Sequence, residues 1–152
     1  METIAAAAPA SGIARLYVGL VNLLDRLQPI FALAMRLYVA KVFIVSGWLK
    51  LSRWDSTLAL FENEYHVPLL SPHVAAVLGT MAELGLPVLL ILGIGTRAAA
   101  LALFVFNIIA VISYPDLSDA GLKDHYLWGA LMLVIAVYGP GKLSLDHWIG
   151  GR

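Results

Sequence analysis

Long apolar runs separated by short polar stretches dominate this chain. Four such runs, rich in Ala, Val, Leu and Ile, cover residues 30–49, 73–94, 97–114 and 123–138. A helix needs about 20 apolar residues to cross the hydrocarbon core of a bilayer, and only the fourth run falls clearly short of that length. No alternating strand pattern is present, and lipid cannot satisfy the backbone of an open sheet. The pattern therefore predicts an all-α fold, a four-helix transmembrane bundle.

A more polar segment precedes the first run. Residues 12–28 place apolar side chains at helical spacing but interrupt them with Arg15, Asn22, Asp25 and Arg26. We expect an N-terminal amphipathic helix that lies in the membrane interface and enters the first span at Pro29, because proline is tolerated in the first turn of a helix. The domain division is a flexible tail at 1–11, a membrane domain at 12–149 and a C-terminal tail at 150–152.

The composition agrees with a membrane protein and narrows its chemistry. Of the 152 residues, 61% are apolar and 13% are charged, and the mean hydropathy is +0.85. Ten basic and ten acidic residues cancel, so no global field attracts nucleic acid. The absence of cysteine excludes disulfides, thiolate catalysis and iron–sulfur ligation by this chain. A redox role would therefore depend on a bound molecule or a partner.

The basic residues outside the spans indicate an orientation. With four spans, the N-terminal segment, the turn at 93–97 and the C-terminal tail share one side of the membrane. That side carries five basic residues, whereas the other side carries three, Lys50, Arg53 and Lys123. The positive-inside rule then predicts that both termini are cytoplasmic.

Three ionisable side chains and one asparagine lie well inside the predicted spans. Arg36 and Lys41 lie in the first span, Glu83 in the second and Asn107 in the third. A charged side chain at the bilayer centre costs about 2.5 kcal/mol or more unless it is paired or hydrated. We expect a buried ion pair between Glu83 and either Lys41 or Arg36, with Asn107 completing the polar cluster. Such a cluster serves either as interhelical hydrogen bonding or as a proton relay or ligand pocket.

A candidate cofactor site lies near the other end of the bundle. Trp48, Lys50 and His125 share one depth and could frame an aromatic, basic pocket for the headgroup of a quinone. In the alternative interpretation, His125 only caps its helix in the interfacial water.

The acidic loop after the first span offers weaker evidence for a metal site. Glu62, Glu64 and His66 alternate and would project together from an extended chain. Their spacing matches no metal-binding signature, and acidic loops are usually solvated. The sequence therefore predicts no metal site.

No self-sufficient catalytic motif is present. The chain has no Ser–His–Asp spacing, P-loop, dinucleotide glycine fingerprint or metalloprotease motif. After the fourth span, Gly139-Pro140-Gly141 breaks the helix, and Asp146 could anchor the turn that follows to Arg36 or Arg97.

An ordered set of residues resembles a known family. The set comprises Arg36, Phe43, Gly47 and Lys50 in the first span, Ala82-Glu83 and Gly93 in the second, Thr96-Arg97-Ala98-Ala99 opening the third, and Gly139-Pro140-Gly141-Lys142-Leu143-Ser144-Leu145-Asp146 after the fourth. Over about residues 12 to 149, this order resembles the DoxX family of small bacterial inner-membrane proteins.

The resemblance implies a four-helix protein of the bacterial inner (plasma) membrane that is associated with redox systems. Related proteins include a subunit of thiosulfate:quinone oxidoreductase and a membrane scaffold that assembles a superoxide dismutase with a thiol-handling partner. Similar relatives accompany copper-binding peptides. The implied partners are the lipid bilayer and proteins of a redox or metal-handling system, and quinone is the candidate cofactor.

Three functions stay open on this basis. The leading hypothesis is a non-catalytic accessory or scaffold subunit of a redox or metal-stress system. The second is a quinone-coupled oxidoreductase subunit, with Lys50 and His125 near the headgroup and Glu83 carrying protons. The third is a small transporter that uses the polar residues of the spans, which would need an oligomer because four short helices leave little room for a pore. Small residues permit helix contacts within or between chains, so a homo-oligomer is also open.

Overall fold

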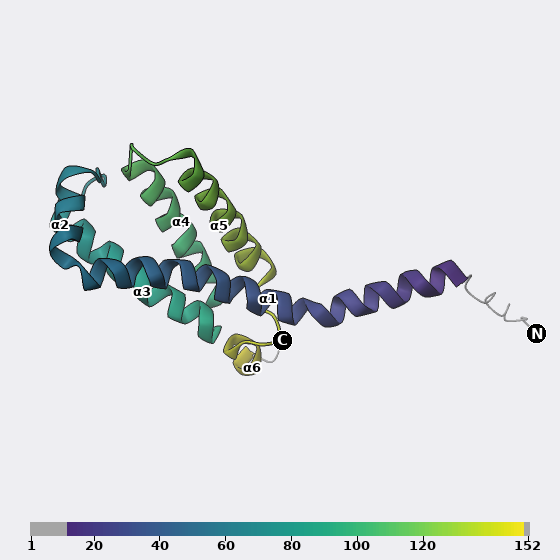
Figure 1. Cartoon of the computed structure of the whole chain (residues 1–152). Coiled ribbons are helices and arrows are strands. Elements are labelled where there is room, and N and C mark those ends of the chain that lie inside the picture. Colours follow the sequence, from purple (N-terminus) through teal and green to yellow (C-terminus); the bar gives the residue numbers. More distant parts are fainter. Residues whose placement is uncertain (1–11, 151–152) are drawn as a thin grey trace, which may run out of the picture.

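The computed structural model describes residues 12–150, and helices dominate this part of the chain (Figure 1). The elements are α1 (Gly12–Ser52), α2 (Trp54–Asn63), α3 (Pro72–Leu92), α4 (Thr96–Ser113), α5 (Asp119–Tyr138) and α6 (Leu145–Gly150). Helices α1, α3, α4 and α5 are each long and apolar enough to cross a membrane. The predicted all-α fold, with four helices able to span a membrane, is confirmed. The expected tail at 1–11 and the last two residues lie outside the described residues.

The fourth spanning helix is longer than its apolar run. It starts at Asp119 rather than at 123 because Ser118 acts as an N-cap, its hydroxyl accepting a hydrogen bond from the Gly121 N–H at 3.2 Å. Helix α5 therefore has 20 residues, enough to cross a bilayer.

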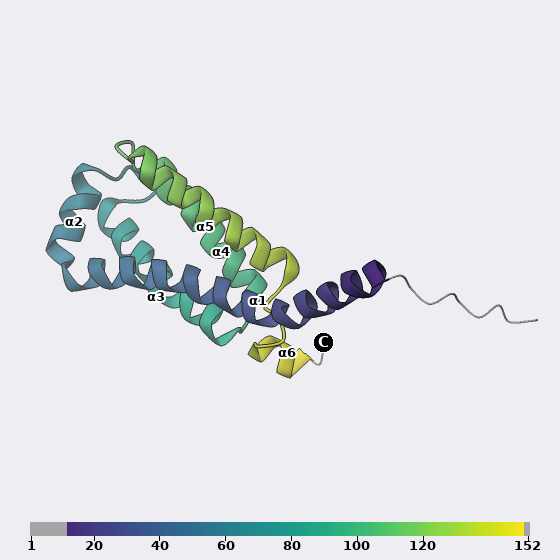
Figure 2. The same ribbon diagram turned by 45° about the vertical axis from the view of Figure 1, so that its right-hand side comes forward.

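Helix α1 runs through the expected junction at Pro29 without a break. Its 41 residues form one helix with Pro29 inside it, so residues 12–28 and the first predicted span are continuous. Proline removes one backbone hydrogen bond and bends a helix, and Figure 2 shows α1 changing direction beside the bundle. Residues 12–28 project away from the other helices and leave apolar side chains such as Ile13 and Leu16 exposed (Figure 1). The placement of this half in the membrane interface stays a prediction.

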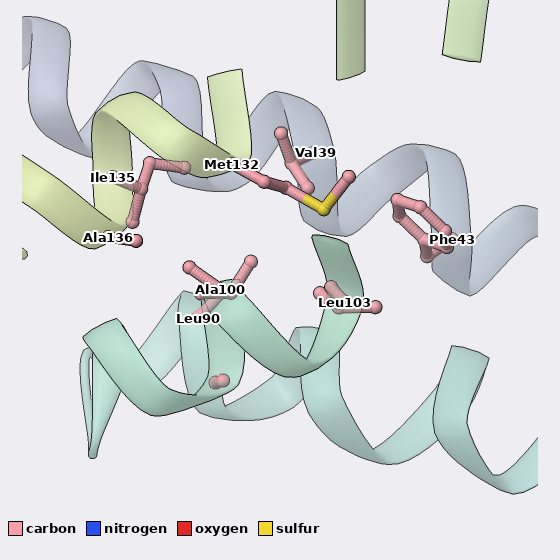
Figure 3. Packing of buried hydrophobic residues seen from close by; sticks show 9 residues of the cluster. Val39, Phe43, Leu90, Ala100, Leu103, Met132, Ile135 and Ala136 are labelled. Atoms are coloured by element: carbon pink, nitrogen blue, oxygen red, sulfur yellow. The ribbon is translucent and has the colours of Figure 1, made fainter. Parts of the chain in front are cut away.

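The core lies where the four spanning helices meet (Figure 3). Its buried side chains are Val39 and Phe43 from α1, Leu90 from α3, Ala99, Ala100 and Leu103 from α4, and Met132, Ile135 and Ala136 from α5. The three alanines let the helix backbones approach one another. Such close packing stabilises helices in lipid, where no hydrophobic effect drives them together.

Helices α1 and α3 come close at Gly47. A Cβ atom at this position would lie 2.9 Å from the Cβ atom of Glu83 and 3.0 Å from the side chain of Leu84. Only glycine fits this contact without moving one helix. The contact also sets which side chains of α1 face α3.

We predict that Gly47→Val lowers the melting temperature of the purified protein. Overpacking of this kind costs about 1–3 kcal/mol because the helices must separate. Gly85→Val is the matched control, since Gly85 is a glycine of α3 with nothing packed within 4 Å of the place where its Cβ atom would stand. Equal melting of the two variants in a thermal unfolding assay would contradict the close contact.

Candidate functional site

Arg36 binds backbone oxygen atoms instead of a carboxylate. Its side chain is 1% exposed, and its Nε atom donates to the Leu90 oxygen at 2.7 Å while Nη2 donates to the Ile91 oxygen at 2.9 Å. Nη1 donates to the carbonyl oxygens of Pro140 and Leu143, both at 2.8 Å. The possible pair between Arg36 and Glu83 is therefore absent. Arg36 instead joins the last turn of α3 to the connection between α5 and α6.

Asp146 reinforces the same end of the bundle. Its two carboxylate oxygens accept hydrogen bonds from the backbone N–H groups of Gly95 and Thr96, each at 2.8 Å, and so cap the start of α4. Partial burial acts to raise the pKa of Asp146, but the hydrogen bonds from Thr96 and Gly95 and the charge of Arg36 lower it overall. Asp146 therefore anchors this turn to the backbone of α4, and not to Arg36 or Arg97 as the sequence suggested.

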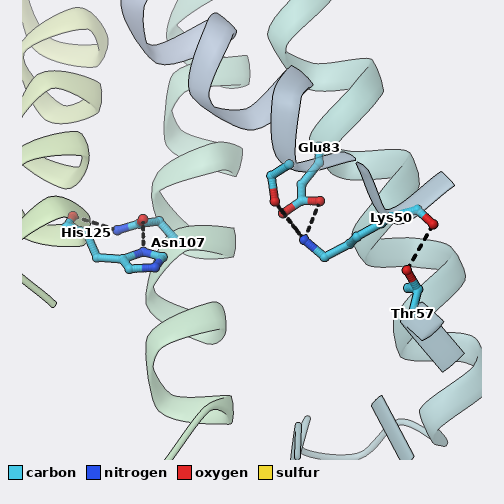
Figure 4. A network of polar contacts seen from close by, with 6 residues as sticks. Lys50, Thr57, Glu83, Asn107 and His125 are labelled. Carbon is cyan, nitrogen blue, oxygen red and sulfur yellow. Dashed lines mark hydrogen bonds and ion pairs between the residues drawn. The ribbon is translucent and has the colours of Figure 1, made fainter. Parts of the chain in front are cut away.

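Glu83 pairs with Lys50 (Figure 4). The Lys50 Nζ atom lies 2.8 Å from both carboxylate oxygens of Glu83 and 2.8 Å from the Ser46 hydroxyl, which itself donates to Glu83 at 3.0 Å. The side chains of Lys50 and Glu83 are 16% and 6% exposed. A charged pair with an additional hydroxyl is the arrangement that a buried carboxylate requires.

The predicted pair between Lys41 and Glu83 is wrong. Glu83 faces Gly47, and residues three or four positions from Gly47, such as Lys50, share that side of the helix. Lys41 is six positions away, so it points elsewhere and is exposed. Among the described residues it has no ion pair or hydrogen bond.

Asn107 forms a separate polar contact with His125 (Figure 4). Its Nδ2 atom donates to the His125 backbone oxygen at 3.0 Å, and its Oδ1 atom lies 2.7 Å from His125 Nδ1. The ring of His125 also meets the edge of Trp128, with centroids 4.8 Å apart. The expected single cluster is thus divided within the described chain: Arg36, Glu83 and Asn107 each have separate partners.

A largely apolar cavity of about 460 Å³ lies among α2, α3, α4 and the connection between α2 and α3. Lys50 and Glu83 border it, and Leu78, Ala82 and Phe106 contribute apolar wall. This combination suits a molecule with a polar head and an apolar body.

Only one of the three residues predicted to hold a quinone lines this cavity. Lys50 lines it, whereas Trp48 and His125 do not. Trp48 is 64% exposed on the outer side of α1, and His125 contacts Asn107 instead. Sequence spacing placed the three residues at one depth but could not show their directions around the helices.

Tyr65 is a wall residue of the cavity that the sequence did not single out. It stacks between Phe61 and Tyr114, with ring centroids 4.8 Å and 5.0 Å away. Burial, followed by the negative charge of Glu83, raises the pKa of Tyr65, so its hydroxyl stays protonated and can donate a hydrogen bond. No periodic signal marks this residue, because it lies in the connection after α2.

The side chains of the acidic loop do not come together as a candidate metal site. Glu62, Glu64 and His66 are all exposed, and the described part of the chain contains no group of three or more His, Asp or Glu residues that could hold a metal ion. The backbone N–H of His66 donates to the Ser113 oxygen at 2.8 Å, which ties the loop to the end of α4.

We predict that Lys50→Met destabilises the protein by about 3–5 kcal/mol, because Glu83 would be left as an unpaired buried charge. The double variant Lys50→Met with Glu83→Leu should recover much of this loss in thermal unfolding. Lys123→Met, at an exposed position, serves as the control. If Lys50→Met and Lys123→Met melted alike, the pair would not be a stability determinant.

Known proteins are similar to the chain along most of its length. Residues 31–115 match the DoxX family. The inner membrane protein YphA of Escherichia coli (strain K12) is 30% identical over 132 residues, which cover 79% of this chain and 91% of YphA. An uncharacterized protein of Haemophilus influenzae is 29% identical over 126 residues, covering 77% of this chain and 82% of that protein. No solved structure matches the chain. With its four apolar helices and this similarity, the chain is a multi-pass membrane protein that belongs to the DoxX family.

Proposed function

We propose that the chain is an accessory or scaffold subunit of a redox or metal-stress system and that the outer face of α1 binds a transmembrane partner. The family resemblance supports the redox or metal-stress setting. The observation that supports a partner is the position of Lys41, a cation on the outside of a spanning helix.

Lys41 lies within the bundle region of α1. It is five residues beyond Arg36, roughly 7.5 Å further along the helix axis, and it has no partner among the described residues. A lysine in contact with lipid at this level is costly unless its side chain reaches the interface or meets a carboxylate. A helix of another subunit could supply that carboxylate.

The side chains around Lys41 form a stripe suited to helix packing. The α1 stripe consists of exposed residues that alternate at spacings of four and three: Ala34, Tyr38, Lys41, Val45 and Trp48. This is the spacing by which one helix packs along another. The stripe therefore supports docking of a single helix.

A partner other than a second copy fits the stripe better. A symmetric contact between two copies would bring two Lys41 ammonium groups together. The acidic residues in the four apolar runs of a second copy are not placed to meet Lys41. Asp124 lies at the end of its run, and Glu83 is already paired with Lys50. The complementary partner is a helix with an Asp or Glu within the membrane.

We predict that Lys41→Glu releases the partner from the gently purified complex, as measured by native mass spectrometry. Charge reversal turns attraction into repulsion, whereas Lys123→Glu, on the exposed start of α5, should leave the complex intact. The partner that copurifies with the wild-type chain should have an acidic residue in a spanning helix. Changing that acidic residue to its amide should also release the partner. Retention by Lys41→Glu, or equal loss in the control, would refute the proposed docking.

A second proposal is that the 460 Å³ cavity holds a quinone. Its apolar wall suits the ring and tail, the protonated Tyr65 hydroxyl can donate to a quinone oxygen, and the Lys50 ammonium places a positive charge at the border of the cavity. Glu83 lies beside Lys50 and would carry protons if the bound quinone were reduced by a partner. The placement of His125 near the headgroup stays a prediction, because His125 does not line this cavity.

We predict that quinone copurifies with the wild-type protein and that Ala82→Leu, which fills the cavity, removes most of it. Lipid extraction followed by chromatography measures the quinone retained per chain. Ala98→Leu is the control, because Ala98 is exposed on α4 and does not line the cavity. Absence of quinone from the wild-type protein, or equal retention by both variants, would overturn this proposal without affecting the docking of a partner.

A further inference from the structure

A second pocket lies at the opposite end of the bundle from the 460 Å³ cavity. It has a volume of about 630 Å³ and forms where α1 passes the end of α5 and the connection to α6. Both views of the chain show these three elements together at this end (Figures 1 and 2). We call this space the α1–α5 pocket.

One wall of the α1–α5 pocket is apolar and is built from two spanning helices. Phe31 and Met35 of α1 face it from one side, and Val134 and Tyr138 of α5 from the other. A groove between two spanning helices offers its surface to the acyl chains of lipids. An apolar ligand segment would therefore lie along α1 and α5.

The rim of the pocket carries positive charge. Arg97 and Lys142 both line it, and neither has an ion pair or hydrogen bond with another residue of the described chain. The guanidinium of Arg97 lies beside Gly139, 3.1 Å from where a Cβ atom would stand, so the glycine leaves room for it. These two side chains are available to an anion.

The acid at this rim is already engaged. Both carboxylate oxygens of Asp146 accept backbone N–H groups at the start of α4, at 2.8 Å. Asp146 therefore neutralises the end of that helix rather than Arg97 or Lys142. The pocket combines two available cations with an apolar wall.

We infer that the α1–α5 pocket binds an anionic phospholipid, with the phosphate at Arg97 and Lys142 and an acyl chain between α1 and α5. A lipid fits better than a soluble phosphate because the wall is apolar. Exposed aromatic side chains also surround this end, with Tyr138 76% and Trp148 78% exposed, as is typical at the headgroup level of a membrane. This end is the one predicted to face the cytoplasm, where anionic lipids attract basic residues.

The test compares binding of phosphatidylglycerol and phosphatidylcholine to the full chain in neutral detergent, by native mass spectrometry. The wild-type protein should prefer phosphatidylglycerol. The double variant Arg97→Gln with Lys142→Gln should weaken that binding by roughly fivefold for each cation removed, and so by about 25-fold. The matched control, Arg53→Gln with Lys123→Gln, removes two exposed cations at the other end and should keep the preference.

Two further measurements separate loss of the lipid site from misfolding and from binding of a soluble anion. Lys142→Gln alone should still lower the affinity about fivefold if loss of Arg97 prevents folding. Glycerol phosphate, which has the anion but no acyl chain, should not compete. An unchanged preference in both Lys142→Gln and the double variant would overturn the lipid site, as would equal loss in the control. Full competition by glycerol phosphate would replace the lipid with a soluble anion and overturn the inference.

Discussion

A single buried guanidinium, that of Arg36, holds one end of the bundle together by binding four backbone oxygens. Arg36 donates hydrogen bonds to carbonyl oxygens in the last turn of α3 and in the connection after α5. Carbonyls near a helix end have no partner in their own helix, and hydrocarbon offers none. Arg36 therefore satisfies these groups and holds three segments together. Close packing is part of this arrangement, since a Cβ atom on Gly93 would lie 3.0 Å from Nη2 of Arg36 and 2.5 Å from the Ser144 Cβ atom.

The two ends of the bundle consequently differ in character. At the Arg36 end, Asp146 caps α4 and donates its own backbone N–H to the Gly93 oxygen at 2.7 Å. These polar links fasten the chain after α5 to the turn between α3 and α4. At the other end, α2 and the following connection cover a cavity bordered by Lys50 and Glu83. Hydrogen bonds to the backbone thus fasten the Arg36 end, whereas a buried ion pair borders the cavity at the other end.

The charged residues of the spans are held in different ways, and the differences bear on function. Arg36 is satisfied by backbone oxygens, and Glu83 is satisfied by Lys50 and Ser46. Lys41 alone among these residues faces outward without a partner in the described chain. A cation that the fold does not use is the feature most directly explained by a second protein. This exposed position of Lys41 is the basis of the docking that we propose for the outer face of α1.

Hydropathy along the chain was sufficient to determine the class, the number of spans and their approximate limits, because burial in lipid depends on the local density of apolar residues. The sequence also shows that Arg36, Lys41 and Glu83 lie within spans. It therefore predicts that these charged side chains need partners. Which side chains meet was decided only by the tertiary structure. The close contact at Gly47 fixes the rotation of α1 against α3, so Lys50 faces Glu83 while Lys41 faces outward. Depth in the membrane follows from sequence position, but direction around a helix becomes meaningful only once its neighbours are in place.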